Sequence, residues 1–283
     1  MSLHCLLDYL TPACFGTVLL VFSLIALIKL YFKGGVFKAN KDLDLTGKTA
    51  VVTGGNSGIG AETVVYLTKK GCSVLIGARD ASTAEAVIKR CRSENPSCKV
   101  DFLPLDLSSR ASIESFAKGV TFSNVNFLIN NAGLMAIPRR KLTKEGLEMQ
   151  WGVNHIGHFY LTYLLWSKIK ITPNFRVVNV SSLAHKRNMG FLGQPTLDFE
   201  NINYETNYND IEAYGRSKLY NVLFTRALAS KIDPSQGKVL SLHPGVVRTE
   251  LMREITSEGI GKLVAVVMVL IHPIYWLFTK NPW

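Results

Sequence analysis

The stretch Thr53-Gly54-Gly55-Asn56-Ser57-Gly58-Ile59-Gly60 follows directly on a short β-branched run, Thr49–Thr53. Three glycines that end a strand and open a helix are typical of a turn against which a pyrophosphate can lie. Gly54 permits the tight turn, Gly58 close approach to the phosphates, and Gly60 close packing of helix on strand. The amino end of such a helix adds unpaired N–H groups and partial positive charge. The residues of this turn that we expect to contact a cofactor are Gly54, Asn56, Ser57, Gly58, Ile59 and Gly60.

Short β-branched segments alternate with longer helical patterns along the rest of the chain. Strands that alternate with helices of this length form βαβ units, and they predict a parallel sheet covered by helices on both faces. The expected strands are Thr49–Thr53, Ser73–Gly77, Val100–Leu103, Asn126–Asn130, Arg176–Val180 and Lys238–Leu242, and the expected helices lie near 59–70, 81–94, 109–120, 146–170 and 211–231. The predicted fold class is therefore α/β, a Rossmann-type doubly wound parallel sheet of six strands.

Composition limits the class of protein. The chain has 283 residues, of which 47% are hydrophobic and 19% charged, so it can bury a sizeable core and is not dominated by disorder. Its formal net charge of +11 could indicate nucleic-acid binding. The basic residues are scattered and no recognition module is present, so we expect no nucleic-acid partner but attraction to an anionic membrane surface. The histidines lack metal-ligand spacing, and we expect no catalytic metal.

An uncharged segment of twenty residues, Tyr9–Ile28, lies near the amino terminus. A helix of that length spans about 30 Å, the thickness of a bilayer's hydrocarbon core. No Lys or Arg precedes it and no A-x-A site follows, which disfavours a cleaved signal peptide. The basic residues follow it, which predicts a lumenal amino terminus and a cytosolic main domain. We interpret residues 1–45 as a transmembrane anchor and stalk, and 46–283 as the main domain of a single-pass protein of the endoplasmic reticulum membrane.

The end of the second expected strand bears on the choice of cofactor. A site for NAD would place an Asp or Glu there, accepting hydrogen bonds from the ribose hydroxyls. This chain has Ala78 at that position, and Arg79 follows with a guanidinium suited to a 2′-phosphate. The sequence therefore favours NADP(H). Asp80, one position later, is interpreted as the cap of the next helix.

Tyr214 and Lys218 lie four residues apart at the start of an expected helix, so their side chains share one face. A free phenol has a pKa near about 10 and is a poor base at neutral pH. A nearby ammonium group, together with an oxidised nicotinamide, favours the phenolate and lowers that pKa. A surface tyrosine beside a solvated lysine is the alternative, because this spacing is common.

The glycine spacing T-G-x-x-x-G-x-G and the Y-x-x-x-K pair occur together with Asn131-Ala132-Gly133 after the fourth strand and Ser181-Ser182 after the fifth. In this order they resemble the short-chain dehydrogenase/reductase superfamily, over residues 46 to about 278. The segments NSGIG, LINNAG, VNVSSLAH, YGRSKLYNVLFT and HPGVVRTEL are similar to its membrane-bound retinol dehydrogenase group.

The resemblance implies hydride transfer between C4 of nicotinamide and a carbonyl carbon. Tyr214 would pass the proton, and Ser182 would orient and polarise the oxygen, with Ser181 as the alternative serine. Lys218 would lower the Tyr214 pKa and grip the ribose, and Asn154 would support Lys218 through a water molecule.

The resemblance also implies further cofactor contacts. The turn at Asn131, Ala132 and Gly133 would lie beside the adenosine, and Asp106 beside the adenine. After the sixth strand, a turn near the nicotinamide would include Pro244, Gly245 and Val247, and Thr249 would hold the carboxamide.

The segment after the sixth strand is strongly apolar at 263–271 and 274–278. In the superfamily this region forms a variable lid, and an apolar lid suits a lipophilic substrate such as a retinoid, a steroid or a fatty aldehyde. A second membrane span is the rival interpretation, although His272 and Pro273 interrupt the run. Family members continue beyond the position of Trp283 with a helix and a seventh strand, so we expect a domain truncated at its carboxyl end. A homodimer is an open alternative to a monomer.

The sequence thus supports two hypotheses. The first is a membrane-anchored, NADP(H)-dependent oxidoreductase acting on a lipophilic alcohol or carbonyl, retinol or retinal first among them. The second is a non-catalytic, membrane-anchored cofactor-binding or interaction protein.

Overall fold

The computed structural model describes residues 42–186 and 197–245, together with the single positions 20, 23, 27, 195 and 247. Within them, six parallel strands form one sheet in the order β3-β2-β1-β4-β5-β6. The strands are β1 (Thr49–Thr53), β2 (Ser73–Ala78), β3 (Val100–Pro104), β4 (Phe127–Asn130), β5 (Phe175–Val180) and β6 (Gly237–Leu242). The helices are α3 (Gly58–Lys69), α4 (Ala81–Glu94), α5 (Arg110–Gly119), α6 (Met149–Trp151), α7 (Gly157–Lys170) and α8 (Asp210–Ala229), with a π-helical turn η1 (Gly152–Ile156) and a 3₁₀ turn η2 (Leu183–His185). The predicted doubly wound sheet is confirmed, each strand within one residue of its expected bounds.

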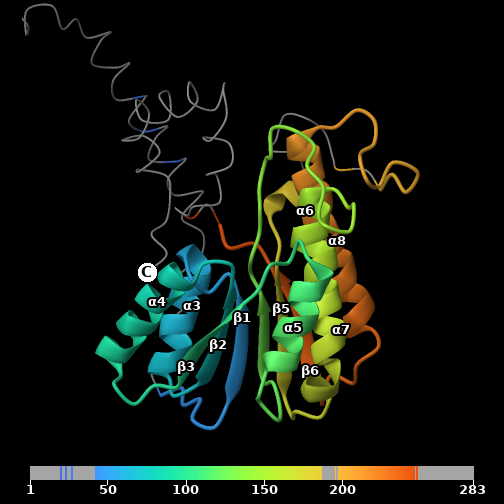
Figure 1. Cartoon of the computed structure of the whole chain (residues 1–283). Helices are drawn as coiled ribbons and strands as arrows, with labels where there is room; N and C mark the ends of the chain where they lie inside the picture. The colour runs from blue at the N-terminus through green and yellow to red at the C-terminus, as the bar shows by residue number, and fades with distance from the viewer. Residues whose placement is uncertain are drawn as a thin grey trace, which may run out of the picture.

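Helices cover both faces of the sheet (Figure 1). Val52 and Ile76 belong to the apolar cluster under α3 and α4, whereas Val51 and Leu75 belong to the cluster under α5 and α7. Alternate residues of one strand therefore face opposite layers, which explains why the strand sequences are apolar throughout. The strand order reverses between β1 and β4. In such sheets ligands bind beyond the carboxyl ends of the strands at this reversal.

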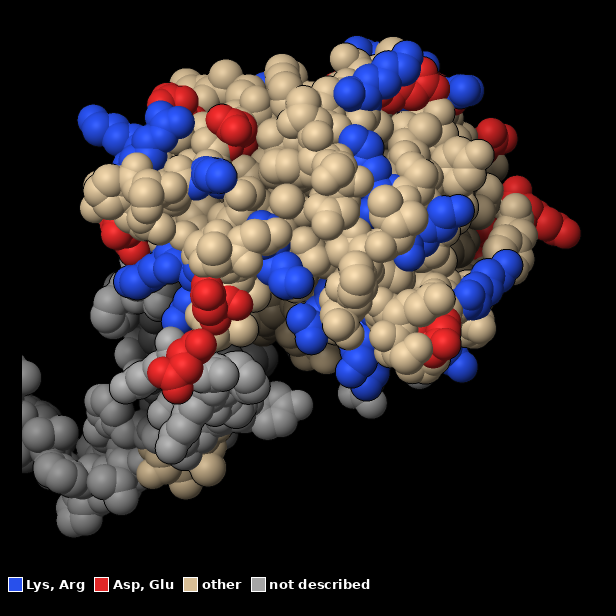
Figure 2. All heavy atoms as spheres, turned by 90° about the horizontal axis from the view of Figure 1, so that it is seen from below, with Lys and Arg blue, Asp and Glu red and all other residues tan. Residues whose placement is uncertain are grey.

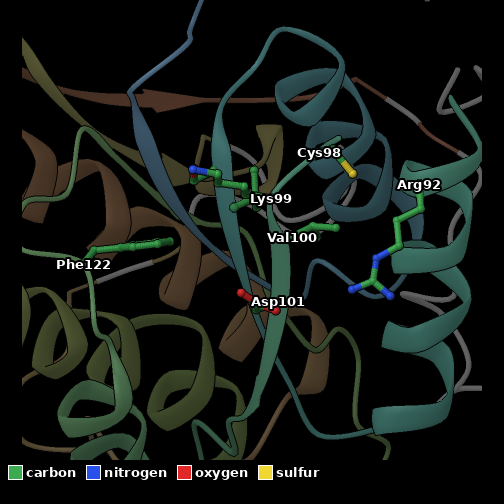
Figure 3. A pocket seen from close by; sticks show the side chains of 8 residues that line it. Arg92, Cys98, Lys99, Val100, Asp101 and Phe122 are labelled. Carbon is green, nitrogen blue, oxygen red and sulfur yellow. The ribbon is translucent and has the colours of Figure 1, made fainter. Parts of the chain in front are cut away.

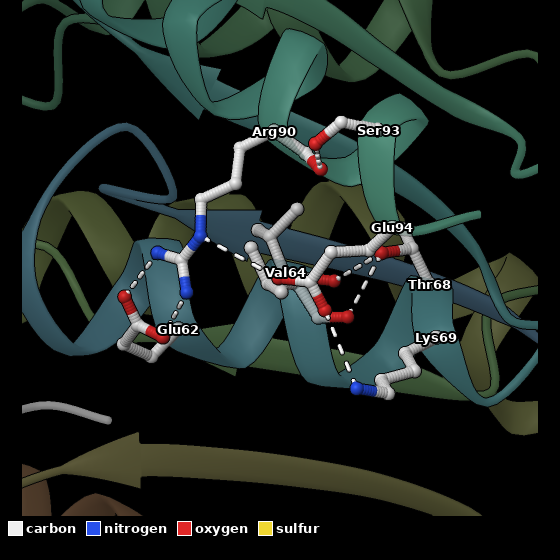
Figure 4. Close-up of polar contacts among 8 residues, drawn as sticks. Glu62, Val64, Thr68, Lys69, Arg90, Ser93 and Glu94 are labelled. Carbon is white, nitrogen blue, oxygen red and sulfur yellow. Dashed lines mark hydrogen bonds and ion pairs between the residues drawn. The ribbon is translucent and has the colours of Figure 1, made fainter. Parts of the chain in front are cut away.

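A cluster of ion pairs joins α3 to α4 (Figure 4). The Arg90 guanidinium meets both carboxylate oxygens of Glu62, one of them at 2.8 Å. Arg90 Nε lies 3.7 Å from Glu94, whose other carboxylate oxygen lies 3.4 Å from Lys69 Nζ. A two-pronged arginine–carboxylate contact fixes orientation as well as distance. It therefore holds together the two helices whose amino ends flank the glycine turn and Arg79.

The expected helical stretch at 146–170 is observed as three consecutive elements, α6, η1 and α7, which run from Met149 to Lys170. The helix begins at Met149, because the carboxylate of Glu148 caps it by accepting from the backbone N–H groups of Gln150 and Trp151. It then widens into η1 before α7 begins. The physical reason is tertiary: a Cβ on Gly157 would lie 2.7 Å from the Leu107 carbonyl, so the chain presses against the loop after β3 at this point. Single π-turns of this kind are frequent at functional sites.

Several predicted features fall outside the described residues: the body of the anchor at Tyr9–Ile28, the apolar lid at 263–278, and Thr249. In the part of the chain that the structure describes, no helix combines the length and apolar character needed to cross a bilayer.

Charged side chains of both signs are spread over the face of the molecule that is seen from below (Figure 2). Lysine and arginine side chains occupy several places on this face, and acidic side chains lie near some of them (Figure 2). Positive charge on this face is therefore spread over several places, in line with the scattered pattern of the sequence.

Candidate active site

The glycine turn after β1 is closed tightly against its neighbours. Gly54 and Gly58 have positive φ values of 63° and 51°, which glycine adopts without strain. A Cβ on Gly60 would lie 2.1 Å from the Gly54 carbonyl oxygen and 2.6 Å from Asn131 Nδ2, so no other residue fits there. Ser57 precedes α3 without a side-chain cap, and no acidic residue lies in the first turn. The amino end of α3 can therefore offer its N–H groups to a phosphate, and these residues fit a dinucleotide.

The turn after β4 is bonded to the end of β1. The Asn131 side chain donates to the Thr53 carbonyl at 2.9 Å, and the backbone N–H groups of Asn131 and Ala132 donate to Thr53 Oγ1 at 2.9 and 3.0 Å. Gly133 follows, and a Cβ there would lie 3.3 Å from Asn154 Oδ1 and 3.4 Å from Lys218 Nζ. The predicted turn is thus a rigid connection between the glycine turn and the lysine.

At the end of β2, Ala78 is buried and Arg79 is exposed. Asp80 Oδ1 accepts from the Ser82 hydroxyl and N–H, both at 2.8 Å, and from the Thr83 N–H at 3.3 Å. These hydrogen bonds lower the pKa of Asp80. Asp80 therefore caps α4, as interpreted from the sequence, and Arg79 is the cation at this corner.

Asn56 and Asp106 also border the same edge of the sheet. Asn56 Nδ2 donates to the Thr83 hydroxyl at 2.8 Å, which ties the glycine turn to the start of α4. Asp106 Oδ1 accepts from the Ser108 N–H at 3.0 Å and hydroxyl at 2.7 Å. Asp106 thereby shapes the loop after β3, which frames the expected adenine site.

Tyr214 lies in the first turns of α8, where Asn209 caps the helix by accepting from the Glu212 N–H at 2.8 Å. Its ring is buried against Met135 and Ala184. Burial raises the pKa of Tyr214, and a side-chain hydrogen bond with Ser182 only partly opposes this. The lower pKa expected from the sequence requires a bound oxidised nicotinamide beside the ammonium group. The protein's own groups instead keep the phenol protonated at neutral pH, ready to donate a proton.

The two adjacent serines have different surroundings. Ser181 is buried, and its hydroxyl donates to the Lys218 carbonyl at 2.8 Å, so it fastens β5 to α8. Ser182 is half-buried, accepts from the Ala184 N–H at 3.2 Å, and shares the hydrogen bond with Tyr214. The structure therefore brings Ser182, and not Ser181, to the phenol.

Lys218 is buried, and burial lowers its pKa to about 8. Its ammonium group donates to the Val180 carbonyl at 3.2 Å and lies 5.6 Å from the centroid of the Tyr214 ring. The lysine therefore retains most of its positive charge at neutral pH, under the phenol and beside Gly133.

Asn154 lies in the π-turn with its side chain fully engaged. Oδ1 accepts from the Leu134 N–H at 2.8 Å, while Nδ2 donates to the Leu134 carbonyl and to Ser217 Oγ, both at 2.9 Å. Ser217 in turn donates to the Tyr214 carbonyl at 2.7 Å. Asn154 thus clamps the segment after Gly133 to the helix that carries the tyrosine.

Two further residues of this network were not found from the sequence. His158 Nε2 lies 2.8 Å from Thr53 Oγ1, and its Nδ1 lies 3.0 Å from the Asn154 carbonyl oxygen. Burial lowers the pKa of His158 to about 3, so the ring is neutral. Asn221 Nδ2 donates to the Asn154 carbonyl at 3.1 Å and to the Val180 carbonyl at 3.3 Å. Both lie near motif residues in sequence, but spacing alone does not show which neighbours they meet.

The loop after β6 lies beside the serine segment that follows β5. Gly245 has a φ of 85°, and His243 Nδ1 accepts from the Leu183 N–H at 3.4 Å, which joins this loop to the serine segment. Pro244 and Val247 are half-buried. Among the described residues, no group of three or more His, Cys, Asp or Glu side chains could hold a metal ion.

A surface cavity of about 240 Å³ lies at the opposite ends of β2 and β3 (Figure 3). Arg92, Cys98 and Phe122 are among the residues that line it. None of the predicted site residues does, so the cavity is separate from the site built around Tyr214.

Comparison with known proteins agrees with this arrangement. The short chain dehydrogenase family matches residues 48–194. Human retinol dehydrogenase 13 is 39% identical over 97% of this chain and 79% of its own length, and human retinol dehydrogenase 12 is 42% identical over 80% and 69%. A crystal structure of an uncharacterised protein from Mycobacterium paratuberculosis is 37% identical with a TM-score of 0.62, over 75% of this chain and 74% of that one. Levodione reductase, 18% identical over 84% of this chain and 86% of its own, shares the fold with a TM-score of 0.63. This chain therefore belongs to the short-chain dehydrogenase/reductase superfamily, as an oxidoreductase related to the retinol dehydrogenases.

Proposed function

We propose that this protein is an NADP(H)-dependent oxidoreductase that interconverts a lipophilic alcohol and its carbonyl compound, retinol and retinal first among them. The observation that carries the proposal is the meeting of Tyr214, Ser182 and Lys218 at the carboxyl edge of the sheet. A protonated phenol, a neighbouring hydroxyl and a buried ammonium group are what carbonyl reduction requires from a protein.

The chain's own residues would act as follows. The Ser182 hydroxyl, with its position fixed by Ala184, would hold and polarise the carbonyl oxygen of the substrate. The Tyr214 phenol would donate its proton to that oxygen as negative charge develops there. The Lys218 ammonium group would stabilise the resulting phenolate. The nicotinamide, when bound, supplies or accepts the hydride.

The preference for NADP(H) rests on the corner beyond β2. Asp80 Oδ1 accepts hydrogen bonds from the first turn of α4. The position that would carry an Asp or Glu in an NAD site is Ala78. Arg79 is exposed there and can meet a 2′-phosphate with a planar fork of donors.

The substrate class and the compartment rest on the relatives and on the sequence. The curated relatives reported above are named retinol dehydrogenases. An apolar segment at 263–278 suits a lipophilic molecule. An anchor at Tyr9–Ile28 would place the enzyme on the endoplasmic reticulum, with the catalytic domain in the cytosol, where such a substrate can enter from the bilayer.

Microsomes that contain the full chain provide the test. We expect NADPH-dependent conversion of all-trans-retinal to retinol, with much weaker conversion when NADH replaces NADPH. The Tyr214→Phe variant, assayed at equal protein content, is the matched control. Folded protein that binds NADPH but reduces neither retinal, nor a steroid ketone, nor an aliphatic aldehyde would contradict the proposal.

A further inference from the structure

The buried ammonium group of Lys218 shares its hydrogen-bond acceptor with another side chain. Lys218 Nζ donates to the Val180 carbonyl oxygen at 3.2 Å, and Asn221 Nδ2 donates to the same oxygen at 3.3 Å. Asn221 lies three residues after Lys218 on α8, so both side chains project from one face of the helix. Asn221 is itself buried, with 3% of its surface exposed. The amide and the ammonium group thus occupy the two acceptor positions of one carbonyl oxygen at the end of β5.

The second N–H of the same amide reaches the π-turn. Asn221 Nδ2 donates to the Asn154 carbonyl at 3.1 Å, and His158 Nδ1 lies 3.0 Å from the same oxygen. A carbonyl oxygen has two lone pairs, and both are used here. Asn221 therefore links the Asn154 carbonyl directly to the Val180 carbonyl that also accepts from Lys218.

The orientation of the amide follows from its partners. Two carbonyl oxygens require the NH₂ group, so Asn221 Oδ1 must face His155 Nδ1, which lies 3.1 Å away. His155 then carries its proton on Nδ1. The ring is neutral, since burial lowers its pKa to about 4. His155 also stacks on Tyr220, with ring centroids 5.3 Å apart, which fixes its plane. The amide is therefore held on three sides.

We propose that Asn221 is a positioning residue for Lys218: its side chain ties the Val180 carbonyl to the Asn154 turn and so fixes the ammonium group beneath Tyr214. This inference rests on the proposed function, because it assigns the reason why the lysine must be held. Asn221 touches neither the phenol nor the expected cofactor position, so its effect passes through Lys218.

The surroundings of Lys218 make its charge sensitive to this clamp. The titratable groups that face it are Tyr214 on its own helix and the neutral His158 on α7. β5 contributes a carbonyl, η1 contributes Asn154, and the turn after β4 contributes Gly133. Burial is the cause of the low lysine pKa, and among the described residues no carboxylate offsets it. Removal of the Asn221 amide would open space for water and loosen the ammonium group, which should restore a more ordinary lysine pKa.

Two variants of the full chain test the inference. Asn221→Ala removes the clamp. Asn179→Ala is the matched control, because Asn179 is an equally buried amide of β5 that bonds Asn130 and Thr225 but not the Val180 carbonyl. Both variants should lose stability. Only Asn221→Ala should lower kcat for retinol oxidation, by about tenfold at pH 7, with KM for the alcohol changed less than about twofold. Its acidic limb of kcat against pH should move upward by about half a pH unit or more, because a loosened ammonium group stabilises the phenolate less.

A second readout needs no turnover. For the full chain in detergent without cofactor, stability should rise between pH 8 and pH 9.5 as the buried lysine loses its proton. This rise should be at least halved in Asn221→Ala and retained in Asn179→Ala. The inference is overturned if Asn221→Ala keeps the wild-type pH profile and stability rise, or if Asn179→Ala changes both equally. If the wild-type chain shows no turnover, the proposed function fails, and the stability measurement still decides the role of Asn221.

Discussion

The ammonium group of Lys218 lies 5.6 Å from the centroid of the Tyr214 ring, one turn further along α8. Burial shifts the pKa values of the two groups in opposite directions. It raises the pKa of the phenol and lowers that of the lysine to about 8. At neutral pH the tyrosine therefore holds its proton and the lysine keeps most of its charge. This pairing suits a tyrosine that donates a proton to a carbonyl oxygen and is then stabilised as the phenolate.

The two serines after β5 should separate catalysis from stability. Ser182→Ala removes the group that meets the phenol, and we expect kcat to fall about 100- to 1,000-fold, as for loss of an oxyanion donor. Ser181→Ala removes the buried hydroxyl that donates to the Lys218 carbonyl, and should cost about 1 kcal/mol of unfolding free energy with kcat within severalfold of wild type. Steady-state kinetics and urea unfolding check both. The reverse pattern would assign the catalytic role to Ser181.

The affinity for NADPH should depend on the charge of Arg79, which follows the end of β2. Arg79→Ala removes the cation proposed to meet a 2′-phosphate, so the Kd for NADPH should rise about 10- to 100-fold while the Kd for NADH stays within about twofold. Asp80→Asn is the control, because asparagine also caps helices and should leave the ratio of the two constants unchanged. Titration of cofactor fluorescence measures these constants. An equal loss of affinity for both cofactors would mean that Arg79 does not read the phosphate.

The stability of the protein should increase with pH through the lysine's titration. The unfolded chain binds this proton more tightly, with a pKa near 10.5 against about 8 in the fold, so each step upward in pH favours folding. The gain between pH 8 and pH 9.5 should be about 1–2 kcal/mol. Lys218→Met should lack this gain and be more stable than wild type at pH 8. Chemical unfolding of both proteins at three pH values measures this gain. If the unfolding free energy rises equally with pH in both proteins, Lys218 is not the group that causes the rise.

At acid pH the two buried, neutral histidines should make the folded protein less stable. Burial lowers the pKa of His155 to about 4 and of His158 to about 3, from 6.5 in the unfolded chain. The unfolded state therefore takes up protons first, and stability should decline as pH falls below 6.5. His158 alone should account for on the order of 1–2 kcal/mol between pH 6.5 and pH 5. His158→Gln should show a shallower decline over that range. A decline as steep as that of wild type would show that His158 is not held neutral.

Much of the fold follows from the sequence because local signals were strong. β1 is an apolar run that is followed by Gly54, and β2 is one that ends at Ala78 shortly before the helix cap Asp80, so the ends of both strands could be predicted within one residue. The motif residues also lie together at the carboxyl edge, as parallel strands require.

What could not be predicted depends on contacts between distant segments. At the π-turn, Gly157 packs against the Leu107 carbonyl, and side chains from α7 and α8 bond to the Asn154 carbonyl. Neither contact leaves a periodic signal. The sequence likewise does not show how far Tyr214 is buried, and it is this burial by distant segments that raises the pKa of the phenol among the protein's own groups.

Isotope transfer tests the proposed reaction most directly. All-trans-retinal is incubated with the full chain in microsomes and NADPH that carries deuterium at C4 of the nicotinamide, on each face in turn. We expect one deuterium on the carbinol carbon of the retinol formed, from one face only, and at least about 1,000-fold slower formation of that product with Tyr214→Phe. Retinol that carries no deuterium from either face, or equal transfer by Tyr214→Phe, would contradict hydride transfer with Tyr214 as the proton donor.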